Sequence, residues 1–238
     1  MRRRFFVDAV RNGHAAVEGA EARHLTRVLR VDAGQRYEIS DNSNVYLAEI
    51  ETARKERVVF RVLERLETPN GFPNAILCVA LIKFDRFEWM IEKATELGVS
   101  EIVPVQTARA ERGLERAAQK RVERWRRIAF EASQQSRRAR LPNVREPLFF
   151  DAAILQSANY RLALDEEHGG APLLSASPTQ LEPDQSIALL IGPEGGWTEG
   201  ERAAFVEAGW KRVSLGPLIL RAETAAIAAL AVVAQRAL

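Results

Sequence analysis

From residue 76 onward, short apolar runs alternate with amphipathic segments, and this alternation limits the possible folds more than any other feature of the sequence. Residues 76–82 form a continuous apolar run of the kind that parallel sheets bury on both faces. In residues 86–97 apolar side chains recur at helical spacing, and Gly98 is suited to end that helix. We therefore predict βα units around a mostly parallel sheet. The other predicted strands are residues 102–105, 161–164, 187–191 and 212–215, with a helix at 198–208.

Two further helices are predicted. Residues 114–136 have the pattern of one long helix with Trp125 on its apolar side and arginines on the outside, and Pro142 prevents it from continuing. Residues 223–238 are apolar on nearly every side. A helix of that composition is expected to be buried or to lie at a subunit interface.

A turn-rich stretch with two prolines and a glycine, residues 68–73, divides the chain. Before it, one helix is predicted at residues 21–30, with Leu25, Val28 and Leu29 on its apolar face. Short strands rich in Val, Phe, Tyr and Ile are predicted at residues 4–7, 36–39, 45–52 and 57–66. These patterns predict a small β-barrel with one helix over residues 1–70 and an α/β domain over residues 74–238.

Composition excludes several classes of protein. Hydrophobic residues make up 47% of the 238 residues and charged residues 28%, so a folded chain is expected rather than a disordered one. The sequence shows no signal-peptide core and no apolar stretch of membrane-spanning length, so we expect a cytoplasmic protein without a membrane contact. The single cysteine, Cys78, lies in an apolar run and indicates a buried structural thiol. Three histidines without metal-ligand spacing predict no metal site.

Charge is distributed unevenly along a chain whose net charge is only +2. The segment from residue 109 to residue 145 holds twelve basic and four acidic residues. In residues 1–36, arginines outnumber acidic residues by eight to four. Two basic zones indicate a polyanionic partner such as nucleic acid. An interpretation without a nucleic-acid partner stays open. The sequence has 29 arginines against five lysines, which is typical of a general arginine bias, and charged helix faces are usually just solvated.

A glycine-rich turn, Ile-Gly-Pro-Glu-Gly-Gly at residues 191–196, joins a predicted strand to a predicted helix. Glycine at such a turn allows positive φ and lets a ligand approach main-chain groups. A tight connection without any ligand explains the pattern equally well. Glu194 also has a purely structural interpretation, because a carboxylate just before a helix is favoured by the helix dipole.

Further motifs are Lys-Phe-Asp-Arg at residues 83–86 with Glu-Lys-Ala-Thr-Glu-Leu-Gly at 92–98, Glu-Ala-Ser-Gln-Gln-Ser at 131–136 followed by Arg138, and Leu-Arg-Ala-Glu-Thr-Ala at 220–225. Together with residues 191–196, and in this order, they resemble the RsmE family, the bacterial 16S rRNA uridine-N3 methyltransferases of the SPOUT superfamily. The likeness covers nearly the whole chain, since residues 4–6 and 24–30 also resemble the family's N-terminal domain. Two positions depart from the family: Arg137 stands where glycine is common, and Gln134 where an acidic residue is common.

The resemblance implies a SPOUT-type α/β methyltransferase domain with a deep C-terminal trefoil knot, preceded by a small PUA-like β-barrel. It also implies S-adenosyl-L-methionine as cofactor, a homodimer, and methylation of N3 of a uridine in 16S rRNA, with the assembled small ribosomal subunit as substrate. The family's cofactor contacts come mainly from main-chain groups of the knot loops, with one apolar wall. In this sequence the implied cofactor-binding residues are Leu164, Ile191, Gly192, Gly196, Leu215, Gly216, Leu220 and Ala225.

Chemistry suggests roles for three residues. The uracil N3 proton must leave, so the site needs a base or fixed positive charge that stabilises the uracil anion. We expect Arg138 and Arg221 to orient the base and stabilise charge, and Glu194 to act as the base or to orient one arginine. Purely structural alternatives are a phosphate contact for Arg138 and an ion pair of Arg221 with Glu194 or Glu223. The basic residues expected to contact RNA are Arg4, Arg23, Arg27, Arg30, Lys83 and Arg86.

Other nucleotide-binding enzymes are excluded by their motifs. The sequence has no Gly-x-x-x-x-Gly-Lys-Ser/Thr run, and residues 83–86 stand where a dinucleotide-binding fold would need Gly-x-Gly-x-x-Gly. A non-catalytic RNA-binding or ribosome-assembly factor on the same fold is the remaining alternative. The intact glycines and Arg221 argue against it.

Overall fold

The computed structural model describes residues 3–67, 74–167, 170–182 and 184–237, which form two compact units. The first unit comprises the described residues up to 67 together with Ser133–Leu141, and the second comprises residues 74–132 and the described residues from Pro142 onward. The turn-rich boundary predicted at residues 68–73 lies outside the described residues. No pattern in the sequence predicted that Ser133–Leu141 belongs to the first unit.

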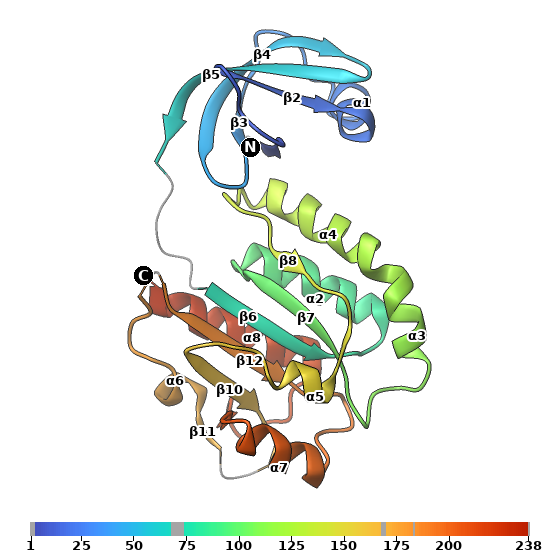
Figure 1. Ribbon diagram of the computed structural model, residues 1–238, viewed down its shortest axis with the longest axis vertical. Coiled ribbons are helices and arrows are strands. Elements are labelled where there is room, and N and C mark those ends of the chain that lie inside the picture. Colours follow the sequence, from blue (N-terminus) through green and yellow to red (C-terminus); the bar gives the residue numbers. More distant parts are fainter. Residues whose placement is uncertain (1–2, 68–73, 168–169, 183, 238) are drawn as a thin grey trace. The chain divides into compact units, whose positions relative to one another are not determined.

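The first unit is built on a curled sheet (Figure 1), which agrees with the predicted small barrel. Its pairing order is β1-β3-β4-β5-β2, with β1 parallel to β3 and the other pairs antiparallel. The register shifts twice between β4 and β5, and such bulges increase strand twist and help a sheet to curl. The strands are β1 (Arg4–Phe6), β2 (His14–Glu18), β3 (Arg36–Ser40), β4 (Val45–Arg54) and β5 (Arg57–Leu66), of which β2 was not predicted.

The core of the first unit lies between the curled sheet and helix α1 (Gly19–Arg27). Phe5 and Phe60 are fully buried with ring centroids 6.3 Å apart, and Leu25 of α1 is fully buried with them. The helix ends at Arg27, three residues earlier than predicted. Val28 is therefore outside the helix and 65% exposed, so its predicted place on the apolar face is wrong.

The second unit has a sheet whose strand pairs are all parallel, which confirms the predicted architecture. Its order is β11-β13-β10-β12-β6-β7-β8, with β9 also beside β7. Side chains of β6 alternate between two cores, with Leu77 and Val79 in one and Ile76 and Cys78 in the other. The strands are β6 (Asn74–Ala80), β7 (Glu101–Gln106), β8 (Asn143–Val144), β9 (Leu148–Phe149), β10 (Tyr160–Leu164), β11 (Ala171–Pro172), β12 (Ser186–Ile191) and β13 (Lys211–Ser214).

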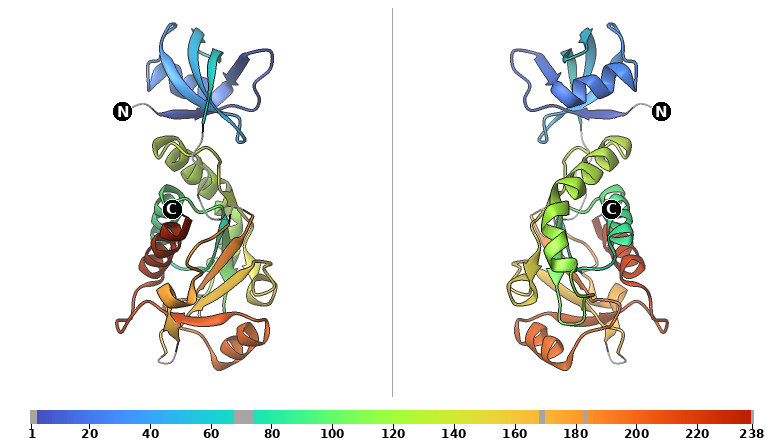
Figure 2. Two further views of the ribbon diagram at one scale, coloured as in Figure 1. Left: turned by 90° about the vertical axis from the view of Figure 1, so that its left-hand side faces the viewer. Right: turned by 90° about the vertical axis from the view of Figure 1, so that its right-hand side faces the viewer.

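Helices cover both faces of this sheet. Figure 2 shows α2 and α8 on one side and α5 and α7 on the other. On the first side Phe87 packs against Trp125, with ring centroids 4.7 Å apart. The helices are α2 (Phe84–Glu96), α3 (Leu114–Ala118), α4 (Val122–Gln135), α5 (Phe150–Ala153), α6 (Leu173–Ala176), α7 (Glu199–Glu207) and α8 (Ala222–Ala234), with 3₁₀ turns at Gln119–Arg121 and Gln235–Ala237.

Two helices differ from the prediction. The helix expected over residues 114–136 is interrupted by the 3₁₀ turn Gln119–Arg121, which separates α3 from α4. The C-terminal helix ends as an α-helix at Ala234, and only one stripe of it, including Ala226 and Leu230, is fully buried. Side chains such as Ile227 and Val232 are half-buried, so this helix keeps partly accessible apolar surface.

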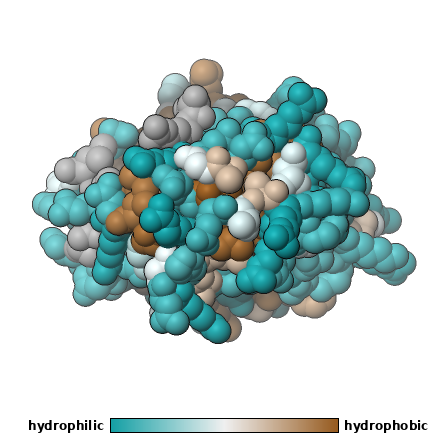
Figure 3. Space-filling model, turned by 90° about the horizontal axis from the view of Figure 1, so that it is seen from above, coloured by the Kyte–Doolittle hydropathy of each residue, from teal (hydrophilic) through white to brown (hydrophobic). Residues whose placement is uncertain are grey.

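Cys78 is fully buried in β6, as predicted for a structural thiol. Burial, together with the nearby negative charge of Glu101, raises the pKa of its thiol to about 12, so the thiolate that reacts or binds metals is disfavoured. Within the described residues, no helix combines the length and apolar character needed to cross a bilayer. The face of the molecule in Figure 3 is largely hydrophilic, with apolar side chains in small patches. The trefoil knot stays a prediction.

Candidate active site

The predicted cofactor-binding residues gather where parallel strands end. Strands β13, β10, β12 and β6 are neighbours in this order, so their carboxyl ends share one edge of the sheet. Ligands of open α/β sheets bind outside that edge. The residues Leu164, Ile191, Gly192, Gly196, Leu215, Gly216, Leu220 and Ala225 lie at the ends of β10 and β12, in the loops after β12 and β13, or in the first turn of α8.

Trp197 joins the ends of two of these strands. Its indole Nε1 donates a hydrogen bond of 2.8 Å to the carbonyl oxygen of Leu164, and its side chain is fully buried. The ring also lies directly against Gly192, where an added Cβ would be 2.9 Å from Trp197 Cε2. The contact is too close for any other residue, so Trp197 by itself accounts for a glycine at position 192.

The other glycines of the turn have close neighbours, and at Gly196 the backbone conformation itself favours glycine. A Cβ on Gly195 would lie 3.2 Å from Cβ of Arg109. Gly196 has a φ of +69°, and a Cβ there would overlap the carboxylate of Glu166. Gly216 is different, because it has a φ of +126° and nothing within 4 Å of the Cβ position. Main chain that a ligand could approach is therefore found at Gly216, whereas packing suffices to explain the turn at residues 192–196.

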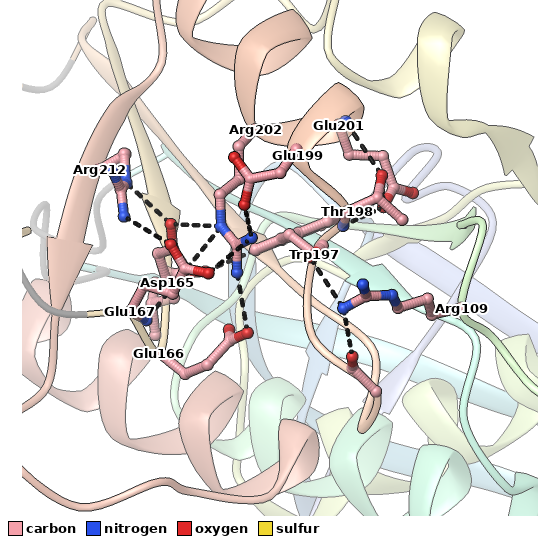
Figure 4. Close-up of polar contacts among 12 residues, drawn as sticks. Arg109, Asp165, Glu166, Glu167, Trp197, Thr198, Glu199, Glu201, Arg202 and Arg212 are labelled. Carbon is pink, nitrogen blue, oxygen red and sulfur yellow. Dashed lines mark hydrogen bonds and ion pairs between the residues drawn. The ribbon is translucent and has the colours of Figure 1, made fainter.

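Polar contacts from the segment that follows β7 fix the same turn (Figure 4). Arg109 donates hydrogen bonds to the carbonyl oxygens of Gly195 at 3.0 Å and Trp197 at 3.1 Å. Glu201 accepts a hydrogen bond of 2.8 Å from the backbone N–H of Ala108 and forms a capping box with Thr198 at the start of α7. The turn is thus held by the segment after β7 as well as by α7.

A buried arginine organises the acidic residues that follow β10. Arg202 of α7 has a side chain only 8% exposed, and its Nε lies 3.2 Å from the fully buried carboxylate of Asp165. Burial would lower the pKa of Arg202, but its hydrogen bond to Asp165 and the neighbouring carboxylates raise that pKa above its ordinary value. Arg212 of β13 also binds Asp165, at 2.8 Å. The remaining partners of Arg202 are Glu166 at 3.1 Å, Glu167 at 2.9 Å and Glu199 at 2.9 Å (Figure 4).

The sequence analysis identified neither this network nor Arg109 and Trp197. One signal was present: the run Asp-Glu-Glu at residues 165–167 directly follows an apolar strand. Acidic side chains at the carboxyl end of a buried strand need cationic partners, and Arg202 recurs on the buried side of α7 with Phe205. The pairing itself joins residues 37 positions apart and could not be derived from local pattern.

A second cluster brings three of the sequence motifs together. Arg86 of α2 forms an ion pair with Glu194 of the glycine turn, and its Nε lies 3.9 Å from Oε1 of Glu223 in α8. The residue predicted to contact RNA at this point is therefore engaged by carboxylates. Among the described residues, Oε2 of Glu223 is buried without a hydrogen-bond partner, which leaves an acceptor at the start of α8.

Arg221 is the N-cap residue of α8 and is exposed. The partner of Glu194 is Arg86, and neither of the proposed ion pairs of Arg221 is formed. Next to Arg221 the apolar side chains of Leu218 and Ile219 are 78% and 82% exposed. Lys83, the N-cap residue of α2, is exposed as well.

Arg138 belongs to the first unit, in the turn that follows α4. Its Nε donates a hydrogen bond of 3.0 Å to the carbonyl oxygen of Arg140, and burial lowers the pKa of its guanidinium to about 10. Arg4 is paired with Glu38 at 2.7 Å and is only 12% exposed. Arg23 is paired with Glu56 at 2.5 Å. The two remaining residues of the first unit that are predicted to bind RNA, Arg27 and Arg30, are exposed.

The basic segment from residue 109 to residue 145 carries less unpaired charge than its composition indicates. Arg121 and Arg124 both bind Glu88 of α2, each at 2.8 Å, and hold the pKa of that carboxylate below its ordinary value although burial opposes this. Further arginines of the segment in ion pairs are Arg126 with Glu123 and Glu146, Arg127 with Glu131, Arg137 with Glu38, and Arg145 with Glu101. A substantial part of this charge therefore stabilises the fold.

Comparison with known proteins shows to which family this chain belongs. A sequence family described as an RNA methyltransferase domain matches residues 70–234, and one described as an RNA methyltransferase PUA domain matches residues 17–63. Ribosomal RNA small subunit methyltransferase E of Synechocystis sp. is 36% identical over 216 residues, covering 89% of this chain and 70% of that protein. The chain belongs to the RsmE family.

Other RsmE proteins agree over nearly the full length. The Bacillus subtilis protein of the same name is 31% identical, covering 92% of this chain and 88% of its own. The crystal structure of ribosomal RNA small subunit methyltransferase E from Neisseria gonorrhoeae, bound to S-adenosyl methionine, is 30% identical and has a TM-score of 0.85. It covers 97% of this chain and 96% of its own. The two-unit architecture is therefore that of RsmE methyltransferases.

The contact between Gly192 and Trp197 yields a prediction about stability. Gly192→Ala should lower the free energy of unfolding by about 1–3 kcal/mol, because its methyl group overlaps a buried indole that has no room to move. Urea unfolding followed by circular dichroism measures this change. Gly200→Ala is the matched control, since nothing lies within 4 Å of its Cβ position, and it should leave stability unchanged or raise it slightly. Equal stability of Gly192→Ala and the unaltered protein would contradict the packing argument.

Proposed function

We propose that this protein transfers a methyl group from S-adenosyl-L-methionine to N3 of a uridine in the 16S rRNA of the small ribosomal subunit. One observation carries the proposal: the cofactor-binding segments implied by the RsmE resemblance all lie along the carboxyl edge of one parallel sheet. The RsmE protein of Neisseria gonorrhoeae, of the same fold, binds S-adenosyl methionine. The cofactor belongs to this edge of the second unit.

The residues at this edge fit such a cofactor. Gly216 offers open main chain, and Leu218 and Ile219 offer exposed apolar surface. When bound, S-adenosyl-L-methionine supplies an electrophilic methyl group on a sulfonium sulfur. The residues that would hold it are Leu164, Ile191, Gly192, Gly196, Leu215, Gly216, Leu220 and Ala225, with Gly192 and Gly196 shaping the turn.

The protein's own contribution to the chemistry concerns the uracil. Loss of the N3 proton leaves negative charge on the base, and a guanidinium stabilises that charge in a site that excludes water. Arg138 and Arg221 are the residues proposed to supply this guanidinium. A pKa of about 10 keeps Arg138 protonated at neutral pH. Because Glu194 is paired with Arg86, it orients that arginine rather than taking the proton.

RNA recognition relies on the exposed basic residues. Arg27, Arg30 and Lys83 are exposed and free to contact phosphates, whereas Arg4 and Arg86 have carboxylate partners. The target uridine must leave its stack to present N3 to the protein, so an unpaired or easily opened site is favoured. Assembled small subunits are the substrate, and the protein acts in the cytoplasm where they are found.

Mass spectrometry of rRNA nucleosides tests the proposed activity directly. Small subunits from a strain that lacks this activity should gain 3-methyluridine in 16S rRNA when the protein and S-adenosyl-L-methionine are both present. Naked 16S rRNA is the comparison substrate, and equal or faster methylation of it would contradict the preference for assembled subunits. RNA binding without saturable binding of S-adenosyl-L-methionine would instead establish a non-catalytic RNA-binding factor.

Arg138 is predicted to act on the RNA and not on the cofactor. Arg138→Ala should lower the rate constant of methylation by about 100-fold, the usual effect of removing one stabilising donor from an active site. Its affinity for S-adenosyl-L-methionine, measured by calorimetry, should be unchanged because Arg138 is not among the predicted cofactor-binding residues. Arg54→Ala removes an exposed arginine of the first unit and serves as the control. Full activity of Arg138→Ala would remove Arg138 from the mechanism.

A homodimer is part of the proposed function. Leu218 and Ile219 are exposed, and α8 keeps half-buried apolar side chains, so a second copy of the chain has apolar surface to cover. Light scattering should give a molar mass near twice the 26.6 kDa of one chain. Ile219→Asp should shift the protein towards single chains, whereas Leu155→Asp, also at an exposed leucine, should not. A molar mass of one chain for the unaltered protein would rule out the dimer.

A further inference from the structure

The turn that carries Arg138 begins with an unusual helix end. Helix α4 stops at Gln135, Arg137 has a φ of +57°, and the N–H of Arg138 donates a 3.0 Å hydrogen bond back to the carbonyl oxygen of Ser133. This is a Schellman-type helix end, in which the left-handed position is normally glycine because a Cβ is disfavoured there. An arginine at position 137 adopts this conformation at a cost in free energy that contacts from elsewhere can offset.

Glu38 of β3 provides contacts of this kind. Its carboxylate forms an ion pair with the guanidinium of Arg137 and receives hydrogen bonds of 3.1 and 2.7 Å from Nε and Nη2 of Arg4. Arg4 in turn donates a 2.6 Å hydrogen bond from Nη1 to the carbonyl oxygen of Arg137. The side chains of Arg4 and Glu38 are each only 12% exposed. Glu38 therefore binds the side chain of Arg137 directly and its main chain through Arg4.

The rest of the turn is fixed by residues close to Glu38. Ser40, two positions further along β3 and so on the same face, donates a 2.6 Å hydrogen bond to the carbonyl oxygen of Ala139. The backbone N–H of Leu141 donates to Oδ1 of Asn42 at 2.7 Å. Since Nε of Arg138 binds the carbonyl oxygen of Arg140 within the same turn, the direction of its guanidinium follows from the backbone that these contacts hold.

The charge state of Glu38 is consistent with this role. Burial alone would raise the pKa of Glu38, but hydrogen bonds from Arg4 and Arg137 hold it below its ordinary value. A carboxylate whose pKa is depressed in the folded protein stabilises the fold above its unfolded pKa. That contribution is lost as the pH falls through the folded value. At neutral pH the clamp of Glu38, Arg4 and Arg137 is therefore fully charged.

We propose that Glu38 is a positioning residue for methyl transfer: through Arg4 and Arg137 it fixes the turn that directs Arg138. The proposal rests on the proposed function, in which Arg138 acts on the RNA. It gives the first unit a second task besides RNA contact, and it assigns Arg4 to the turn rather than to phosphate.

The test compares two carboxylates of the same sheet. Glu38→Gln removes the clamp. Glu49→Gln is the matched control, because Glu49 also binds two arginines, Arg36 and Arg61, but none of its recorded partners lies in Ser133–Leu141. Hydrogen exchange of residues 137–141 reports the turn without any assay of activity, and methylation of small subunits reports its consequence. Calorimetry measures the affinity for S-adenosyl-L-methionine, and the melting temperature measures the stability of the fold.

In Glu38→Gln we expect faster exchange at residues 137–141 and a loss of about 10-fold to 100-fold in kcat/KM for the subunit, as for a misdirected active-site group. The affinity for S-adenosyl-L-methionine should be unchanged, and Glu49→Gln should behave as the unaltered protein. Unchanged exchange in Glu38→Gln, or a loss of activity no greater than in Glu49→Gln, would overturn the proposal. An inactive unaltered protein would refute the proposed function, and with it a positioning role, whatever the exchange rates show.

A rescue distinguishes positioning from general stabilisation. Adding Arg137→Gly to Glu38→Gln puts glycine at the left-handed position, so the turn no longer needs the carboxylate. The double variant should recover exchange protection and methylation to within about 3-fold of the unaltered protein, a ratio that corresponds to a free-energy difference of about RT. If Glu38 only stabilised the unit, loss of a second contact would lower activity further, and that result would overturn the proposal.

Discussion

The hydrogen bond from the indole of Trp197 to the carbonyl oxygen of Leu164 sets the geometry of the carboxyl edge. This hydrogen bond joins the end of β10 to the segment that follows β12. The indole ring of Trp197 packs against Phe150 and Phe205, whose ring centroids are 5.8 and 5.6 Å away. A buried indole that satisfies its N–H has one available position. The position of the ring leaves no space for a Cβ at residue 192, so only glycine fits there. This constraint influences the backbone conformation of the glycine turn.

Electrostatics make the same edge stiff. Asp165 is fully buried and shared by Arg202 and Arg212, so removal of either arginine would leave a charge with too few partners in a medium of low dielectric constant. Buried ions are tolerated only when their hydrogen bonds are nearly complete. Arg202 satisfies this condition because carboxylates from the segment after β10 and from α7 surround its guanidinium. The surrounding residues 166, 167 and 199 are also acidic. This part of the surface therefore carries excess negative charge, which disfavours contact with a polyanion.

Sequence periodicity predicted the longer strands of the second unit, most of whose residues are buried, but not the two-residue strands β8, β9 and β11. The continuous apolar runs of the longer strands, such as residues 187–191, resemble no other element of that length. Strand β2 was missed, since His14–Glu18 is short and contains two alanines, although Ala15 and Val17 alternate as a strand requires. The motifs placed the candidate site at the glycine turn, and that location stays a prediction. The reason for glycine at position 192 was not predicted, because it is a contact with the indole of Trp197 that no local pattern contains.

The segment Ser133–Leu141 shows most clearly why tertiary contacts escape local reasoning. Its two departures from the family pattern each face a residue of the first unit about a hundred positions away. Gln134 donates a 2.7 Å hydrogen bond to Glu21, where a carboxylate would repel, and Arg137 reaches Glu38. Glycine at position 137 would need no partner, because its backbone adopts positive φ unaided. Arginine has a Cβ and is disfavoured at positive φ, so the ion pair with Glu38 offsets part of that cost. The conformation of the turn that carries Arg138 therefore depends on the strand that holds Glu38.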